Sequence, residues 1–79
     1  MTVKELMLSN LIIGDVRLVN NIEPTDEALT EIITDHNWKP MADYYGETVT
    51  GVRANCETRK GEYGYLTHYW CDILIEKAD

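Results

Sequence analysis

The sequence predicts a small α+β domain, in which a mainly antiparallel sheet of three strands, or of four, is covered on one face by two helices. Three observations predict this fold class. Helical periodicity occupies residues 3–9 and 24–36, aliphatic and β-branched residues fill residues 11–19, and residues 47–76 contain two strand-like segments around a turn. The expected order is therefore α-β-α-β-β. A chain of 79 residues has room for one modest core, so we expect a single domain over residues 1–79.

The first predicted element is a short helix that begins after Thr2. Thr2 and Glu5 have the spacing of a capping box, in which each side chain accepts a hydrogen bond from the other residue's backbone amide. Three apolar residues then share one face, namely Val3, Leu6 and Met7. We expect this helix to end near residues 9–10.

The segment "LIIGDVRLV", residues 11–19, has the composition of a strand. Gly14 and Asp15 in its middle leave two interpretations open. They could form the turn of a hairpin, or they could form a bulge within one longer strand. The arms of such a hairpin would be very short, so we favour the bulged strand. The following "NNIEP" predicts a turn.

The second predicted helix covers residues 24–36. Pro24 suits its first turn, and Asp26 suits the positive end of the helix dipole. The apolar stripe consists of Ala28, Leu29, Ile32, Ile33 and His36. Beside it, an acidic residue recurs at every fourth position: Glu23, Glu27, Glu31 and Asp35. Residues 40–46 are expected to add one helical turn closed by Gly46.

The last third of the chain predicts a hairpin of strands 47–57 and 63–76 with its tip at Lys60-Gly61. This register places Arg59 opposite Glu62, and Gly51 opposite Trp70. Alternate residues of the last strand then face the core: Tyr65, Tyr69, Cys71, Ile73 and Ile75. The opposite face carries Leu66, His68, Trp70, Asp72, Leu74 and Glu76. A slip of one residue would exchange these faces.

The net charge of −7 argues against direct binding to DNA, RNA or anionic membranes, and favours attraction to basic partners. The N-terminal residues are too polar for a signal peptide, and no apolar run approaches the roughly 20 residues of a membrane span. We therefore expect a cytoplasmic protein in which Cys56 and Cys71 are reduced.

The residues that could bind a metal or act as nucleophiles match no established spacing. His36, Cys56, His68 and Cys71 fit no zinc pattern, and nothing local would activate the thiol in a Cys71–His36 pair. The glycines form no phosphate-binding motif. Asp72 is the acid that we consider first for a catalytic role, but the simpler interpretation is that it forms an ion pair across the hairpin, for example with Arg53. The sequence thus predicts no catalytic residue, no metal and no cofactor, and a protein that is not an enzyme.

The acidic residues are concentrated in one segment. Residues 22–47 hold seven acids against Lys39, which accounts for −6 of the net charge. Carboxylates in such a ridge could imitate a phosphate backbone to a protein that binds nucleic acid with lysine and arginine. The alternative is a solvated face that keeps a small domain soluble. The candidate partner-binding residues are Glu23, Asp26, Glu27, Glu31, Asp35, Asp43 and Glu47.

A second candidate interface lies on the sheet face that carries His68, Trp70 and Leu74. If no helix covers it, this face is apolar and aromatic, as protein contacts often are. The alternative function is therefore a structural or oligomerising module, for instance a homodimer.

The opening "MTVKEL", followed by an aliphatic strand, an acidic helix and a C-terminal hairpin, resembles small acidic accessory proteins encoded by phages and prophages. The resemblance implies a non-enzymatic role against host machinery. Members of that group include inhibitors of CRISPR–Cas complexes and of restriction enzymes, which often block nucleic-acid sites. It implies a partner with a basic, nucleic-acid-handling surface in the host cytoplasm, and it transfers no individual residue.

Overall fold

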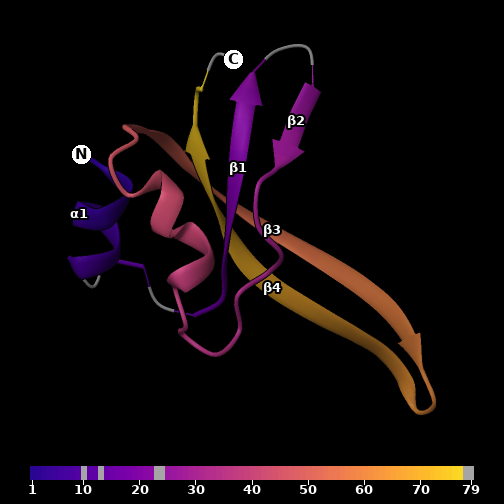
Figure 1. The fold of residues 1–79 in the computed structure, drawn as a ribbon. Helices are drawn as coiled ribbons and strands as arrows, with labels where there is room; N and C mark the ends of the chain where they lie inside the picture. Colours follow the sequence, from indigo (N-terminus) through magenta and orange to yellow (C-terminus); the bar gives the residue numbers. More distant parts are fainter. Residues whose placement is uncertain (10, 13, 23–24, 78–79) are drawn as a thin grey trace.

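The computed structural model describes residues 1–9, 11–12, 14–22 and 25–77. Its elements are α1 (Val3–Leu8), β1 (Val16–Ile22), β2 (Thr25–Ala28), the 3₁₀ helix η1 (Lys39–Tyr44), β3 (Val49–Gly61) and β4 (Gly64–Ile75). Over these residues four strands form one curled, mixed sheet in the order β2-β1-β4-β3, in which β1 and β4 are parallel. The α+β class is confirmed, but the order is α-β-β-η-β-β (Figure 1).

The capping box of α1 is also confirmed. The Thr2 amide donates to Glu5 Oε1 at 3.0 Å, and the Glu5 amide donates to Thr2 Oγ1 at 3.2 Å. The apolar face of α1 is buried as expected and joins the hydrophobic core. The two capping hydrogen bonds join residues that are three positions apart in sequence, so the local pattern alone was enough to predict them.

Strand β1 begins later than expected. Gly14, at φ +100°, lies in a bend before the strand, so it forms neither the turn of a hairpin nor a bulge in a longer strand. Asn20 and Asn21, which were expected in a turn, belong to β1. Their backbones pair with β2, and the Asn20 side chain donates to the Lys77 carbonyl at 3.1 Å and accepts from the Lys77 amide at 2.9 Å.

The predicted helix over residues 24–36 is wrong. Residues 25–28 form β2, and the segment that follows runs beside β1 without helical structure. The Leu29 amide donates to the Leu18 carbonyl at 2.8 Å, and Val16 and Ile33 exchange backbone hydrogen bonds of 3.2 and 2.7 Å. These bonds satisfy backbone groups that a helix would have paired internally. Of the predicted apolar stripe, Ile33 is buried in the core and Leu29 packs against it, whereas Ala28 and His36 are exposed.

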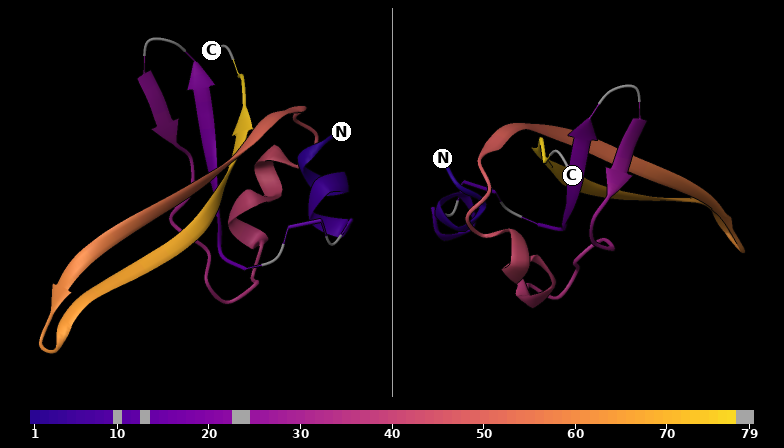
Figure 2. Two further views of the ribbon diagram at one scale, coloured as in Figure 1. Left: turned by 180° about the vertical axis from the view of Figure 1, so that it is seen from behind. Right: turned by 45° about the horizontal axis from the view of Figure 1, so that its top comes forward.

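The expected helical turn over residues 40–46 is present as η1. Met41 of this helix is fully buried, and the Tyr45 hydroxyl donates to the Trp38 carbonyl at 3.2 Å. Together with α1, η1 lies against one face of the sheet (Figure 2). The core between them is formed by Val3, Leu6, Met7, Val16, Leu18, Ile33, Met41, Ile73 and Ile75.

The C-terminal hairpin exists as predicted, but its register is shifted. Cys56 lies opposite Tyr69, not Tyr65, so the tip falls at residues 62–63. The predicted pairs are therefore wrong: Arg59 lies opposite Leu66, and Gly51 lies opposite Leu74. Gly64 permits the turn, because its φ of +131° is one that side chains rarely adopt. The shift is an even number of residues, so the predicted faces of β4 are preserved.

The prediction of which β4 residues face the core is correct only at the C-terminal end of the strand. Ile73 and Ile75 are fully buried against the helices, whereas Tyr65 and Tyr69, also predicted in the core, are exposed. The reason is visible in Figures 1 and 2: the outer part of the hairpin extends beyond the helices, so nothing in the described fold covers its face.

Candidate functional site

The outer half of the hairpin, residues 56–69, projects from the body as a two-stranded ribbon, which we call the arm (Figure 2). The inner half of β4 pairs with β1 from Cys71 onward, so the arm begins where that pairing ends. Within the described residues, β3 and β4 of the arm pair only with each other. An isolated two-stranded hairpin is marginally stable in water, so the arm depends on a well-fixed base.

The arm carries the largest exposed apolar side chains of the hairpin. Tyr63 at the tip is 98% exposed, Tyr65 75%, Leu66 71% and Tyr69 69%. Tyr65 and Tyr69 share one face with the Thr58–Thr67 pair, whose hydroxyls lie 3.2 Å apart. Leu66 lies on the other face, opposite Arg59. This surface was not predicted from the sequence, because the strand pattern placed both tyrosines on the core face.

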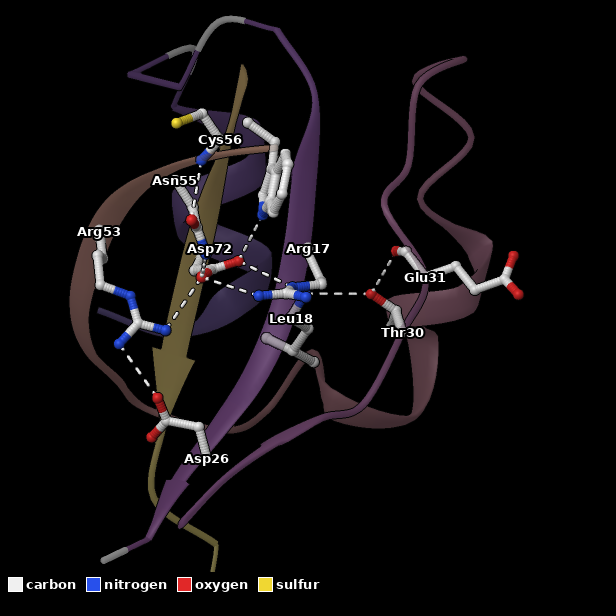
Figure 3. A network of polar contacts seen from close by, with 10 residues as sticks. Arg17, Leu18, Asp26, Thr30, Glu31, Arg53, Asn55, Cys56 and Asp72 are labelled. Atoms are coloured by element: carbon white, nitrogen blue, oxygen red, sulfur yellow. Dashed lines mark hydrogen bonds and ion pairs between the residues drawn. The ribbon is translucent and has the colours of Figure 1, made fainter. Parts of the chain in front are cut away.

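The base of the arm is fixed by Asp72, whose side chain is fully buried. Arg17 on β1 and Arg53 on β3 lie opposite Asp72 on either side. Arg17 donates Nε to Oδ1 at 2.9 Å and a second nitrogen to Oδ2 at 3.1 Å, while Arg53 donates to Oδ2 at 3.0 Å. The predicted Asp72–Arg53 pair is therefore confirmed, and Arg17 adds a partner that the sequence did not indicate (Figure 3).

Two neutral donors complete the cluster around Asp72. Trp70 Nε1 donates to Oδ1 at 2.8 Å, and Asn55 Nδ2 donates to Oδ2 at 3.0 Å. The Arg17 guanidinium also lies 5.3 Å from the centre of the Trp70 ring, within cation–π range. Strands β1, β3 and β4 thus each contribute at least one hydrogen-bond donor to the Asp72 carboxylate.

This environment sets the protonation state of Asp72. Burial by itself raises the pKa of a carboxyl group, because it removes water from the charged form. The hydrogen bonds from Arg17, Asn55, Arg53 and Trp70 outweigh burial and lower the pKa of Asp72 from 3.8 to about 2. Asp72 is therefore a carboxylate at neutral pH, which suits an anchoring role and not proton transfer.

Two further pairs join the arm base to other elements. Asp26 on the edge strand β2 accepts from Arg53 at 3.1 Å, so a side-chain ion pair joins the two edge strands of the curled sheet (Figure 3). His68 Nε2 lies 2.5 Å from Asp15 Oδ2, and its ring centre lies 5.5 Å from that of Trp70. These contacts connect the base of the arm to β2 and to the segment before β1.

The acidic candidates that the structure describes do not form a ridge. Asp26 and Glu27 are consecutive in β2 and point to opposite faces, Glu31 and Asp35 lie in the irregular segment, and Asp43 lies on η1. Glu47 is partly buried and precedes β3, and Glu23 is outside the described residues. In the part of the chain that the structure describes, Asp26 is the candidate acid that forms an ion pair.

The second candidate interface, His68, Trp70 and Leu74, is not an exposed apolar face. Trp70 is buried beside Asp72 with 7% of its surface exposed, and Leu74 is half-buried. His68 is partly exposed but paired with Asp15. The exposed aromatic residues lie further out on the same hairpin, on the arm.

Among the described residues, no group of three or more His, Cys, Asp or Glu side chains is arranged to hold a metal ion. Cys56 is exposed, Cys71 is half-buried, and both are free thiols. A shallow hollow of 330 Å³ lies between the irregular segment and η1, with Glu31, Asp35 and Pro40 among its lining residues. No helix in the described part is long and apolar enough to cross a membrane.

Comparison with known proteins adds no relative. No family model matches the chain, and neither the curated proteins nor the solved structures contain a match.

Proposed function

We propose that this protein acts by binding another protein, and that the arm is its contact element. The observation that carries the proposal is the set of exposed aromatic side chains on a projecting ribbon, Tyr63, Tyr65 and Tyr69. Tyrosine offers a large contact area at a small entropy cost and is enriched at interfaces. A ribbon that leaves the body can also enter a groove that a compact domain could not reach.

The anchor at Asp72 supports this role. Ion pairs in a buried cluster fix the direction of the arm, so less freedom is lost when a partner binds. The carboxylate is saturated by five hydrogen bonds, from Arg17, Arg53, Asn55 and Trp70, which leaves it little capacity to act on a substrate. The cluster thus favours a binding protein over an enzyme.

The resemblance to phage accessory proteins suggests the class of partner. A non-catalytic inhibitor of a host defence or nucleic-acid-handling complex would use a small, rigid contact element of this kind. The exposed acids Glu27, Glu31, Asp35 and Asp43 favour a second contact, with a basic surface. This contact would depend on general charge attraction, because these acids lie on separate elements.

The two contacts are separable by matched variants. Bacterial lysate is passed over the immobilised protein, the Tyr63→Ser/Tyr65→Ser variant and the Glu27→Lys/Glu31→Lys variant, and eluted proteins are identified by mass spectrometry. All four side chains are exposed, so circular dichroism should show an unchanged fold. We expect the tyrosine variant to lose its main partner. Loss confined to the lysine variant, with elution by salt, would assign the contact to the acidic surface instead.

A further inference from the structure

We infer that two copies of this chain associate through the free edge of β3, in antiparallel register about a two-fold axis at Thr58. The inference rests on the proposed role of the arm as a contact element and names a second copy as an occupant. It follows from three features of the arm: which backbone groups face outward, how its charges are spaced, and how much surface it leaves exposed.

The backbone groups of Thr58 face away from β4. In an antiparallel ladder, alternate residues direct both their amide and their carbonyl toward the partner strand, and the others direct them outward. The Cys71 amide faces away from β3, because it donates to the Asp15 carbonyl at 2.9 Å. Thr67 lies four residues before Cys71 and has the same orientation, and Thr58 is directly opposite Thr67. Thr58 therefore offers a donor and an acceptor at the outer edge of β3.

A side chain limits the pairing at the inner end of this edge. The Cys56 amide also faces outward, and it donates to Asn55 Oδ1 at 2.8 Å. The available stretch therefore runs from the Cys56 carbonyl to Lys60. In register about Thr58, the two Thr58 residues bond to each other, and the Lys60 amide of each copy reaches the Cys56 carbonyl of the other.

The spacing of charges selects this register. With the axis at Thr58, Glu57 of each copy lies opposite Arg59 of the other, which gives two opposite-charge pairs. An axis at Cys56 would place Arg53 opposite Arg59, and an axis at Lys60 would place the two Lys60 side chains together. Glu57 and Arg59 now pair within one strand at 3.2 Å, on side chains that are both exposed, so they are free to exchange partners.

The chain exposes more surface than a compact chain of the same length, which leaves area available for an interface. The chain exposes 5727 Å², whereas a compact monomer of this length exposes about 4,900 Å². Its radius of gyration is 13.5 Å, against about 12 Å for a compact chain. The excess is close to the roughly 800 Å² that each partner buries in a standard interface.

Net charge favours the arm as the meeting point of two acidic chains. Each copy carries −7, so most approaches between copies are repulsive. The arm holds two acids, Glu57 and Glu62, and two bases, Arg59 and Lys60, and is therefore neutral. Two copies can join along it without bringing like net charges together.

Sedimentation velocity over micromolar to sub-millimolar concentrations tests the inference. The wild-type chain is expected to form a dimer, and Thr58→Pro is expected to be a monomer. Proline lacks the outward amide but leaves the bonds to β4 in place. Thr67→Pro is the matched control, because it makes the same change on the other edge of the arm, and it should remain a dimer.

Charge exchange provides a second, independent test. Arg59→Glu should weaken the dimer about tenfold or more, because two attractive pairs become repulsive. The Glu57→Arg/Arg59→Glu double variant restores opposite charges across the axis and should restore the dimer.

Four results would overturn the inference: a monomeric wild-type chain, a Thr58→Pro dimer, loss of the dimer in Thr67→Pro, or a double variant as weak as the single one. A monomer that still loses its lysate partner in the Tyr63→Ser/Tyr65→Ser variant would reject the dimer and leave the proposed function intact. A dimer that captures no lysate partner would support the dimer and reject the proposed function.

Discussion

Arg17 and Asp72 lie opposite each other on the two parallel strands at the centre of the sheet and share two hydrogen bonds of 2.9 and 3.1 Å. They are 55 residues apart in sequence, so the pair ties the first strand to the last. It also closes the base of the projecting arm, because Arg53 and Trp70 bind the same carboxylate. The predictions below begin from this cluster.

Replacing Asp72 with asparagine should lower the free energy of unfolding by about 3 kcal/mol. The substitution keeps the shape of the side chain but leaves Arg17 and Arg53 without a counter-charge. The cost is at the low end for a buried ion pair, since both guanidinium groups reach solvent. Urea unfolding measures it. Asp43→Asn, on the exposed surface of η1, is the control and should change stability by no more than about 0.5 kcal/mol.

Stability should fall at acidic pH. The pKa of Asp72 is about 2 in the folded state and 3.8 in its ordinary state, so the folded state favours the charged form. The resulting stabilisation is present above pH 3.8 and is lost as the pH falls toward 2. It amounts to about 2 kcal/mol. Unfolding curves at several pH values should show this loss in the wild-type chain, and a smaller one in Asp72→Asn. Equal slopes in the two proteins would assign the acid sensitivity to other carboxyl groups.

Trp70→Phe should destabilise the protein by about 2 kcal/mol, because it removes a hydrogen bond to a buried carboxylate. The phenyl ring retains most of the packing, so the loss reports on the indole nitrogen. In the Asp72→Asn background the same change should cost about 1 kcal/mol less, since the acceptor is no longer charged. Additive effects in this double-mutant cycle would show that Trp70 and Asp72 are energetically independent.

Gly64→Ala should destabilise the tip of the arm by about 1 kcal/mol. Gly64 has φ +131°, which side chains rarely adopt, and no atom lies near an added Cβ, so the cost arises from the backbone alone. Gly46→Ala is the control: an added Cβ at Gly46 also meets no atom, but Gly46 does not have a positive φ. This variant should be neutral or slightly stabilising. Thermal unfolding followed by circular dichroism compares the two. Equal effects would contradict the backbone explanation.

Prediction from sequence succeeded where the decisive contacts are local. The capping box of Thr2 and Glu5 was found because its partners are three residues apart. The alternation of faces in β4 was found because it follows from strand geometry. It placed Asp72 and Arg53 on the same face, and the observed register brings these two residues directly opposite each other. The hairpin register was missed because Gly61 was placed within the turn, whereas Gly61 and Gly64 pair with each other and the turn lies between them at residues 62–63.

Prediction failed where distant segments decide the structure. Residues 25–36 have apolar residues at helical spacing, yet Leu18 and Val16 on β1 supply their backbone partners. The acidic ridge disappeared with that helix, since Glu27, Glu31 and Asp35 no longer share one face. Tyr65 and Tyr69 have the pattern of core residues, and only the position of the helices shows that they project beyond the core.

The sequence by itself determined the α+β class, the capped first helix, the C-terminal hairpin and the acidic charge of this protein. The tertiary structure decided which segment became the second helix, which side chains surround Asp72, and which aromatic residues reach solvent. The physical reason is the range of the interactions. Capping and strand alternation act within a few residues, whereas burial and the pairing of Arg17 with Asp72 depend on chain segments that only folding brings together.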